Sequence, residues 1–223
     1  WATAVDMMGL EFAKDRILMG AERKSAVISE KNRKLTAYHE GGHALVALYT
    51  DGAHPVHKAT VVPRGMALGM VMQLPESDDE TSVTRRQLLA KLDVAMGGRA
   101  AEELIFGMAD VTTGASSDLE QATRLARAMV TKYGMSEIIG QMAIGYEDMA
   151  SGSLSSETRA LVESEVKKLL TAAHERAVRI LKIHEKELHT LAEELIEKET
   201  LTGKQINELL LGGSASKNIS QEA

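Results

Sequence analysis

Two adjacent glycines, Gly41 and Gly42, stand inside a helical pattern of apolar residues in the stretch TAYHEGGHALVAL, residues 36–48. Glycine in a helix interior costs about 1 kcal/mol relative to alanine. Two such residues side by side therefore predict that neighbouring backbone or another helix passes close to this turn. Few other features of the chain constrain its packing as strongly.

The glycine pair is enclosed by two histidines and a glutamate in the pattern H-E-x-x-H. On a helix, His39 and His43 share one face, so both imidazoles can bind the same ion. Zinc prefers such nitrogen ligands, and a catalytic zinc takes three protein ligands and a water. Glu40 can accept a proton from that water. Because only three residues are fixed, chance matches are common, and two histidines that merely fill a core remain the alternative.

The residues alone leave the third metal ligand open. Asp118 opens a predicted helix after the polar loop DVTTGASS, but an aspartate that only stabilises a helix dipole is an equally good interpretation. The remaining histidines, in a predicted turn or on predicted C-terminal helices, are more typical of solvated side chains: His54, His57, His174, His184 and His189.

Composition excludes other classes of site. The chain has 223 residues, no cysteine and a net charge of −6 without a long basic run. The absence of cysteine excludes thiolate metal sites and a cysteine nucleophile, and the acidic balance indicates that nucleic acid is not a partner. No apolar run reaches the length of a membrane span, so we expect the chain itself to be soluble.

The apolar periodicity predicts a mainly α protein with one small β-sheet near residues 25–75. Helices are expected over 5–19, 36–50, 84–106, 117–133 and 155–184, with shorter ones toward 211. Strands are expected around AVIS, KATVVP and LGMVMQLP. Capping signals place helix starts at Thr36, at Ser117 with Glu120, and at Thr202 with Gln205.

Longer segments carry a resemblance: LEFAKDRILMG, TAYHEGGHALVAL, HKATVVPRGMALGMV, MGGRAAEELIFG, TTGASSDLEQATRLARAMVTKYGMSE, and ETL before INELL. From about residue 5 to 211 they resemble, in order, the peptidase domain of the FtsH family of membrane-anchored AAA+ zinc proteases, peptidase family M41. The amino-acid sequences of these segments are most similar to the organellar branch of the family, which includes the plant chloroplast and the mitochondrial i-AAA types.

The resemblance implies roles for particular residues. One Zn²⁺ per chain would be held by His39, His43 and Asp118, with Glu40 as the general base. Glu102 resembles an acidic position beside the site and could orient a motif histidine; a surface helix carboxylate is the alternative. An edge strand that binds substrate by β-augmentation is implied at Leu68, Gly69, Met70 and Val71.

The resemblance also implies a larger assembly. Family members form hexameric rings, degrade unfolded polypeptides, and use ATP only in a motor whose Walker A loop is missing here. We expect residues 1–20 to be a linker and first helix, residues 21–211 to be the metallopeptidase domain (21–135 around the site, 155–211 as C-terminal helices), and residues 212–223 to be a disordered tail. The implied location is the chloroplast envelope or thylakoid membrane, or the mitochondrial inner membrane, with contact to the membrane only through absent upstream segments.

Two other functions compete with a zinc endopeptidase. One is a catalytically silent platform that holds a hexamer together, which an intact Glu40 disfavours. The other is a helical adaptor, metal-free or with a structural zinc, that binds partner chains, which the complete His/His/Asp set disfavours.

Overall fold

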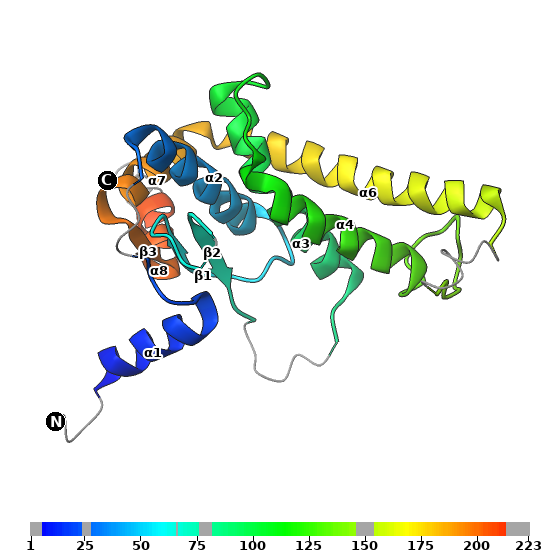
Figure 1. Ribbon diagram of the computed structural model, residues 1–223, viewed down its shortest axis with the longest axis horizontal. Coiled ribbons are helices and arrows are strands. Elements are labelled where there is room, and N and C mark those ends of the chain that lie inside the picture. Colours follow the sequence, from blue (N-terminus) through cyan, green and yellow to red (C-terminus); the bar gives the residue numbers. More distant parts are fainter. Residues whose placement is uncertain (1–5, 24–27, 66, 76–81, 146–153, 213–223) are drawn as a thin grey trace, which may run out of the picture.

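The computed structural model describes residues 6–23, 28–65, 67–75, 82–145 and 154–212 (Figure 1). As predicted, it is mainly helical with one small sheet. The helices are α1 (Met7–Met19), α2 (Glu30–Tyr49), α3 (Arg85–Phe106), the 3-10 turn η1 (Thr113–Ala115), α4 (Ser116–Thr131), α6 (Ser156–Ile183), α7 (Glu185–Lys198) and α8 (Gly203–Leu210). The strands are β1 (Val56–Thr60), β2 (Met70–Gln73) and β3 (Thr200–Thr202).

Helix α2 is the centre of the fold and packs against α3, α6, α7 and β1. Every residue from Thr36 to Ala47 is buried, so for more than three turns the helix has no solvent face. Leu45 of α2 is fully buried, and so are leucines on the three helices that pack against α2: Leu92, Leu181, Leu188, Leu191 and Leu195. The H-E-x-x-H motif is therefore held in a rigid, close-packed environment.

Helices α2 and α3 cross at their glycine pairs. A Cβ atom at Gly42 would lie 2.4 Å from the carbonyl oxygen of Gly97, and one at Gly97 would lie 2.7 Å from the carbonyl oxygen of Gly42. Only glycine permits two helix backbones to approach so closely. At Gly41 the nearest neighbour is instead the side chain of Leu188 on α7, 3.3 Å from an ideal Cβ. The expected close approach at this turn is confirmed.

The sheet is antiparallel, with strand order β2-β1-β3. Strand β2 therefore lies at an edge, and its register pairs Thr60 with Met70 and Ala59 with Val71. Strand β3 was not predicted, because three residues between two helices show no periodicity and pair with β1 only through the tertiary fold. Of the strand expected around AVIS, residues 24–27 lie outside the described residues, and the two that follow are not in a strand.

Two helix starts differ from the prediction. Helix α2 begins at Glu30, with the Ser29 side chain accepting a hydrogen bond from the Asn32 N–H, so Thr36 is an interior, buried residue. The charged residues before position 36 concealed these first turns. Helix α4 begins at Ser116 without a side-chain cap, and Asp118 is its third residue. The predicted capping box at Thr202 is present, and the structure shows another at the start of α3, formed by Thr84 and Gln87.

Helix α1 projects from the body of the molecule in Figure 1. Asp15 of α1 forms an ion pair with Lys58 on β1. Just beyond the end of α1, Arg64 bonds to the carbonyl of Gly20 and to the side chain of Glu22. Large apolar side chains along α1 remain exposed: Met7, Met8, Leu10, Phe12, Ile17 and Leu18. Among the described helices, none combines the length and the apolar character needed to cross a membrane.

Candidate metal centre

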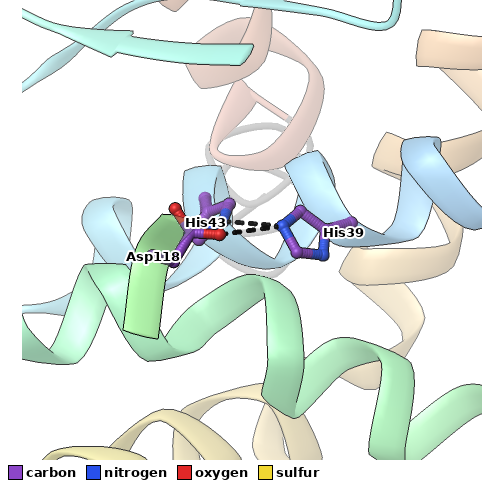
Figure 2. A group of neighbouring side chains, drawn as sticks. All are labelled: His39, His43 and Asp118. Atoms are coloured by element: carbon purple, nitrogen blue, oxygen red, sulfur yellow. Dashed lines mark hydrogen bonds and ion pairs between the residues drawn. The ribbon is translucent and has the colours of Figure 1, made fainter. Parts of the chain in front are cut away.

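The two motif histidines present the same ring nitrogen to one point in space. They lie on one face of α2, and Figure 2 shows their imidazoles and the Asp118 carboxylate pointing toward one another. His39 Nε2 is 3.1 Å from His43 Nε2, and Asp118 Oδ2 is 3.2 Å from the first and 3.5 Å from the second. Ligand atoms about 2.0–2.1 Å from a tetrahedral zinc would be about 3.3 Å apart. The three atoms thus have the spacing of three corners of such a site.

The other ring nitrogen of each histidine is held by an acceptor. His43 Nδ1–H donates to the backbone carbonyl of Val94 on α3, at 2.7 Å. His39 Nδ1–H donates to Glu102 Oε1, also on α3, at 2.8 Å. A proton on Nδ1 leaves the Nε2 lone pair free to bind a metal. The tautomer that a metal requires is therefore set by helix α3 for both residues.

Asp118 reaches this point from the first turn of α4. Burial alone raises the pKa of its carboxyl group, but hydrogen bonds with His39 and His43 outweigh burial and hold the pKa well below its ordinary value. Burial likewise lowers the pKa of His39, and its bonds to Asp118 and Glu102 reverse this and raise it to about 10. Without a metal, both pKa shifts favour a protonated His39 beside an ionised Asp118. A cation that binds here must displace that proton.

Glu102 is completely buried and serves as the acceptor for His39. It also accepts the backbone N–H of Thr112 at 2.7 Å and the Thr112 hydroxyl at 3.0 Å. These bonds tie α3 to the loop that leads into α4. Sequence reasoning missed Thr112, because one threonine in a polar loop carries no distinguishing signal.

A space for an ion exists because position 98 has no side chain. A Cβ atom at Gly98 would lie 2.4 Å from His39 Nε2 and 2.5 Å from His43 Nε2. Any larger residue would occupy the point at which the ligand atoms converge. The adjacent Gly97 and Gly98 are visible in the sequence, in the segment MGGRAAEELIFG, but the role of Gly98 depends on how α3 packs against α2.

Glu40 lies in the same cleft, a cavity of about 1180 Å³ that is bordered by α2, α4 and the β2 region. It is only 6% exposed. Burial raises the pKa of its carboxyl group, and the nearby His43 and His39 act against burial. An ideal Cβ at Gly69 would lie 2.7 Å from Glu40 Oε1, so the backbone just before β2 rests directly on this carboxylate. Gly69 thus permits the strand to pass over Glu40.

The segment expected to form a substrate-binding strand borders this cleft. Met70 and Val71 belong to β2, whereas Leu68 and Gly69 precede it. All four line the cavity. Strand pairing therefore covers the second half of the predicted segment only.

The remaining histidines lie away from the metal centre. His174 contacts Glu103, His184 stacks on Tyr49, and His189 contacts the hydroxyl of Tyr38. Within the described part of the chain, His39, His43 and Asp118 form the one group of three or more residues with metal-ligating geometry. The structure thus brings together the set that the family resemblance implies.

The amino-acid sequence is similar to a known protein family and to known proteins. The model of peptidase family M41 matches residues 26–209. The chain is 61% identical over 202 residues to "ATP-dependent zinc metalloprotease FTSH 11, chloroplastic/mitochondrial" of Arabidopsis thaliana, covering 91% of this chain and 24% of that protein. It is 54% identical over 211 residues to the "ATP-dependent zinc metalloprotease YME1 homolog" of Schizosaccharomyces pombe, covering 95% and 29%.

Bacterial proteins are similar as well. The FtsH zinc metalloprotease of Rickettsia prowazekii is 53% identical over 214 residues, covering 93% of this chain and 33% of that protein. The chain thus spans about a quarter to a third of the length of the curated relatives it matches.

Proposed function

Because the chain belongs to peptidase family M41, we propose that it is a zinc-dependent endopeptidase that hydrolyses unfolded polypeptides. The observation that carries this proposal is the convergence of two imidazole nitrogens and a carboxylate oxygen within 4.8 Å of one another. The name zinc metalloprotease is shared by its relatives. The family match to residues 26–209 also supports residues 21–211 as the peptidase unit.

The donor set fits one zinc ion per chain. We infer that His39, His43 and Asp118 hold it, since nitrogen and carboxylate oxygen are ordinary zinc ligands. The acceptors that face Nδ1 of both histidines, Glu102 and the Val94 carbonyl, and the space left by Gly98 support this assignment. When bound, zinc supplies the Lewis acid that polarises the scissile carbonyl and acidifies the attacking water.

Glu40 would act as the general base. Its carboxylate takes a proton from the attacking water as the water oxygen bonds to the carbonyl carbon. The same carboxyl group then delivers that proton to the amide nitrogen as the C–N bond breaks. A pKa raised by burial supports this role, because a base whose pKa lies nearer to the working pH is more effective. Glu102 would orient His39 from the side opposite the metal.

Substrate would bind along the start of β2, at Met70 and Val71, and along the two residues before it, Leu68 and Gly69. An edge strand offers free backbone N–H and C=O groups, so a peptide can pair with it largely independently of side-chain sequence. The contact between Gly69 and Glu40 supports this position, because a peptide on this strand would lie close to the proposed base.

We further propose that the chain works as part of an ATP-driven protease. Its relatives are named as ATP-dependent, while the chain contains no Walker A loop, so ATP would be used outside it. We extend the proposal to a hexameric ring because the chain belongs to family M41; the exposed apolar side chains of α1 support contact with another protein surface but carry no information on the number of subunits. A location at a chloroplast or mitochondrial membrane is part of this proposal, and the name of the Arabidopsis thaliana relative, which reads chloroplastic/mitochondrial, supports the organelle.

The test combines zinc content with cleavage of an unfolded peptide, before and after a chelator. We expect about one zinc per chain, and activity that the chelator removes and zinc restores. Glu40→Gln should keep the zinc but lose about 10²–10⁴-fold in rate. Glu163→Gln is the matched control, since Glu163 pairs with Arg127 on the surface of α4 and α6. A wild-type chain that binds zinc but cuts no flexible substrate would instead be a silent assembly platform.

A further inference from the structure

The buried carboxylate of Glu102 on α3 accepts most of its hydrogen bonds from one residue, Thr112, in the loop that follows this helix. It is 0% exposed, so protein donors must satisfy both of its oxygens. His39 Nδ1 donates to Oε1 at 2.8 Å. The backbone N–H and the hydroxyl of Thr112 both donate to Oε2, at 2.7 and 3.0 Å. Thr112 is therefore the main partner that holds this carboxylate in place behind the metal ligand.

The same hydroxyl also organises the loop that leads to Asp118. Thr112 is the N-terminal cap of η1, and its Oγ1 accepts the N–H of Gly114 at 3.1 Å. After η1 the chain enters α4 directly, where Asp118 is the third residue. One side chain thus contacts the carboxylate behind His39 and shapes the turn before Asp118.

We propose that Thr112 is a positioning residue that aligns two metal ligands at once: His39 through Glu102, and Asp118 through the turn at η1. This inference rests on the proposed zinc function and extends it to a residue that touches neither metal nor substrate. Without the hydroxyl, Glu102 keeps only the Thr112 backbone donor on Oε2, and the Gly114 N–H loses its acceptor. Both ligands then lose part of the restraint that brings them to one point.

The test measures metal binding, independently of catalysis, in Thr112→Val and Thr112→Ser. Valine has nearly the shape of threonine but no hydroxyl, whereas serine restores the hydroxyl. The readouts are Zn²⁺ affinity by competition with a chromogenic chelator and the visible spectrum of bound Co²⁺, which reports ligand geometry. We expect Thr112→Val to bind Zn²⁺ about 10–100-fold more weakly, the range for losing an outer contact of a metal ligand, with an altered Co²⁺ spectrum.

Two controls separate positioning from general damage. Thr123→Val removes a threonine hydroxyl that bonds only within α4, to the carbonyl of Leu119, and should bind metal as the wild type does. Glu102→Gln tests the route through Glu102. If Thr112 acts on His39 through Glu102, the double variant Thr112→Val/Glu102→Gln will lose less Zn²⁺ affinity than the two single variants lose in sum.

Unchanged Zn²⁺ affinity and Co²⁺ spectrum in Thr112→Val would overturn the inference, and so would a Thr112→Ser variant as weak as Thr112→Val. Fully additive effects with Glu102→Gln would overturn the route through Glu102. A wild-type chain that binds neither metal would overturn the proposed zinc function, and with it this inference. Normal wild-type binding with an unaffected Thr112→Val would overturn only the role of Thr112.

Discussion

Gly98→Ala adds one methyl group at the point where the metal ligands converge. Its Cβ would lie 2.4 Å from His39 Nε2 and 2.5 Å from His43 Nε2. An unstrained contact of a carbon atom needs about 3.5 Å, so the overlap is about 1 Å with both imidazoles. Distances in a metal site tolerate only about 0.2 Å of displacement. The methyl group therefore prevents the two histidines from binding one ion together.

The effect on the fold is expected to be much smaller than the effect on metal binding. Gly98 does not have a positive φ, and alanine in a helix interior is favoured over glycine by about 1 kcal/mol. That gain offsets part of the strain from moving the imidazoles, so the metal-free variant should remain folded. We expect its zinc affinity to fall by more than about 100-fold, the upper figure for losing only an outer-shell contact.

Thermal unfolding of Gly98→Ala with a chelator tests whether the metal-free variant is folded, and thermal unfolding with zinc tests whether it still binds the metal. At free zinc about 100 times the dissociation constant, the wild type should gain about 2.7 kcal/mol of stability, whereas Gly98→Ala should gain almost none. Gly212→Ala is the control, because no atom of the described residues, apart from its chain neighbours and nearby helix backbone, lies within 4 Å of an ideal Cβ there. If Gly98→Ala bound zinc as tightly as the wild type, the ligands would converge elsewhere and the site geometry would be refuted.

Three further predictions concern the ligands and the helix crossing. Asp118→Ala should weaken zinc binding in the same competition assay, and an unchanged affinity would mean that another group completes the site. Gly42→Leu should destabilise the fold by at least about 3 kcal/mol in urea unfolding, because its Cβ would lie 2.4 Å from the rigid Gly97 carbonyl; a fully active variant would contradict the packing described. In the metal-free chain, the pKa of His39 rises to about 10 from an unfolded value of 6.5. Its contribution to stability should be complete below pH 6.5 and lost as the pH rises through about 10. Urea midpoints recorded in the presence of a chelator measure this loss, and a flat profile over that range would exclude it.

Most of the helices could be predicted because their apolar periodicity and caps are local. The capping box at Thr202 and the end of the 84–106 helix before Gly107 are predicted correctly from neighbouring residues. The first turns of α2 were missed because their residues are charged and mostly exposed. Strand β3 was missed because only its pairing with β1 makes it a strand. The starts of helices and short strands depend on contacts that a single segment does not encode.

Local spacing alone placed His39 and His43 on one face of a helix with Glu40 beside them, since the geometry of a helix repeats every 3.6 residues. The choice of Asp118 as third ligand needed the family resemblance, because many carboxylates had suitable chemistry. The tertiary structure decided the rest. It brings Asp118 to His39 across 79 residues of chain, supplies acceptors from α3 for both Nδ1 atoms, and sets Gly98 where an ion needs space. These relations join residues far apart in the chain, and they arise only when α2, α3 and α4 pack together.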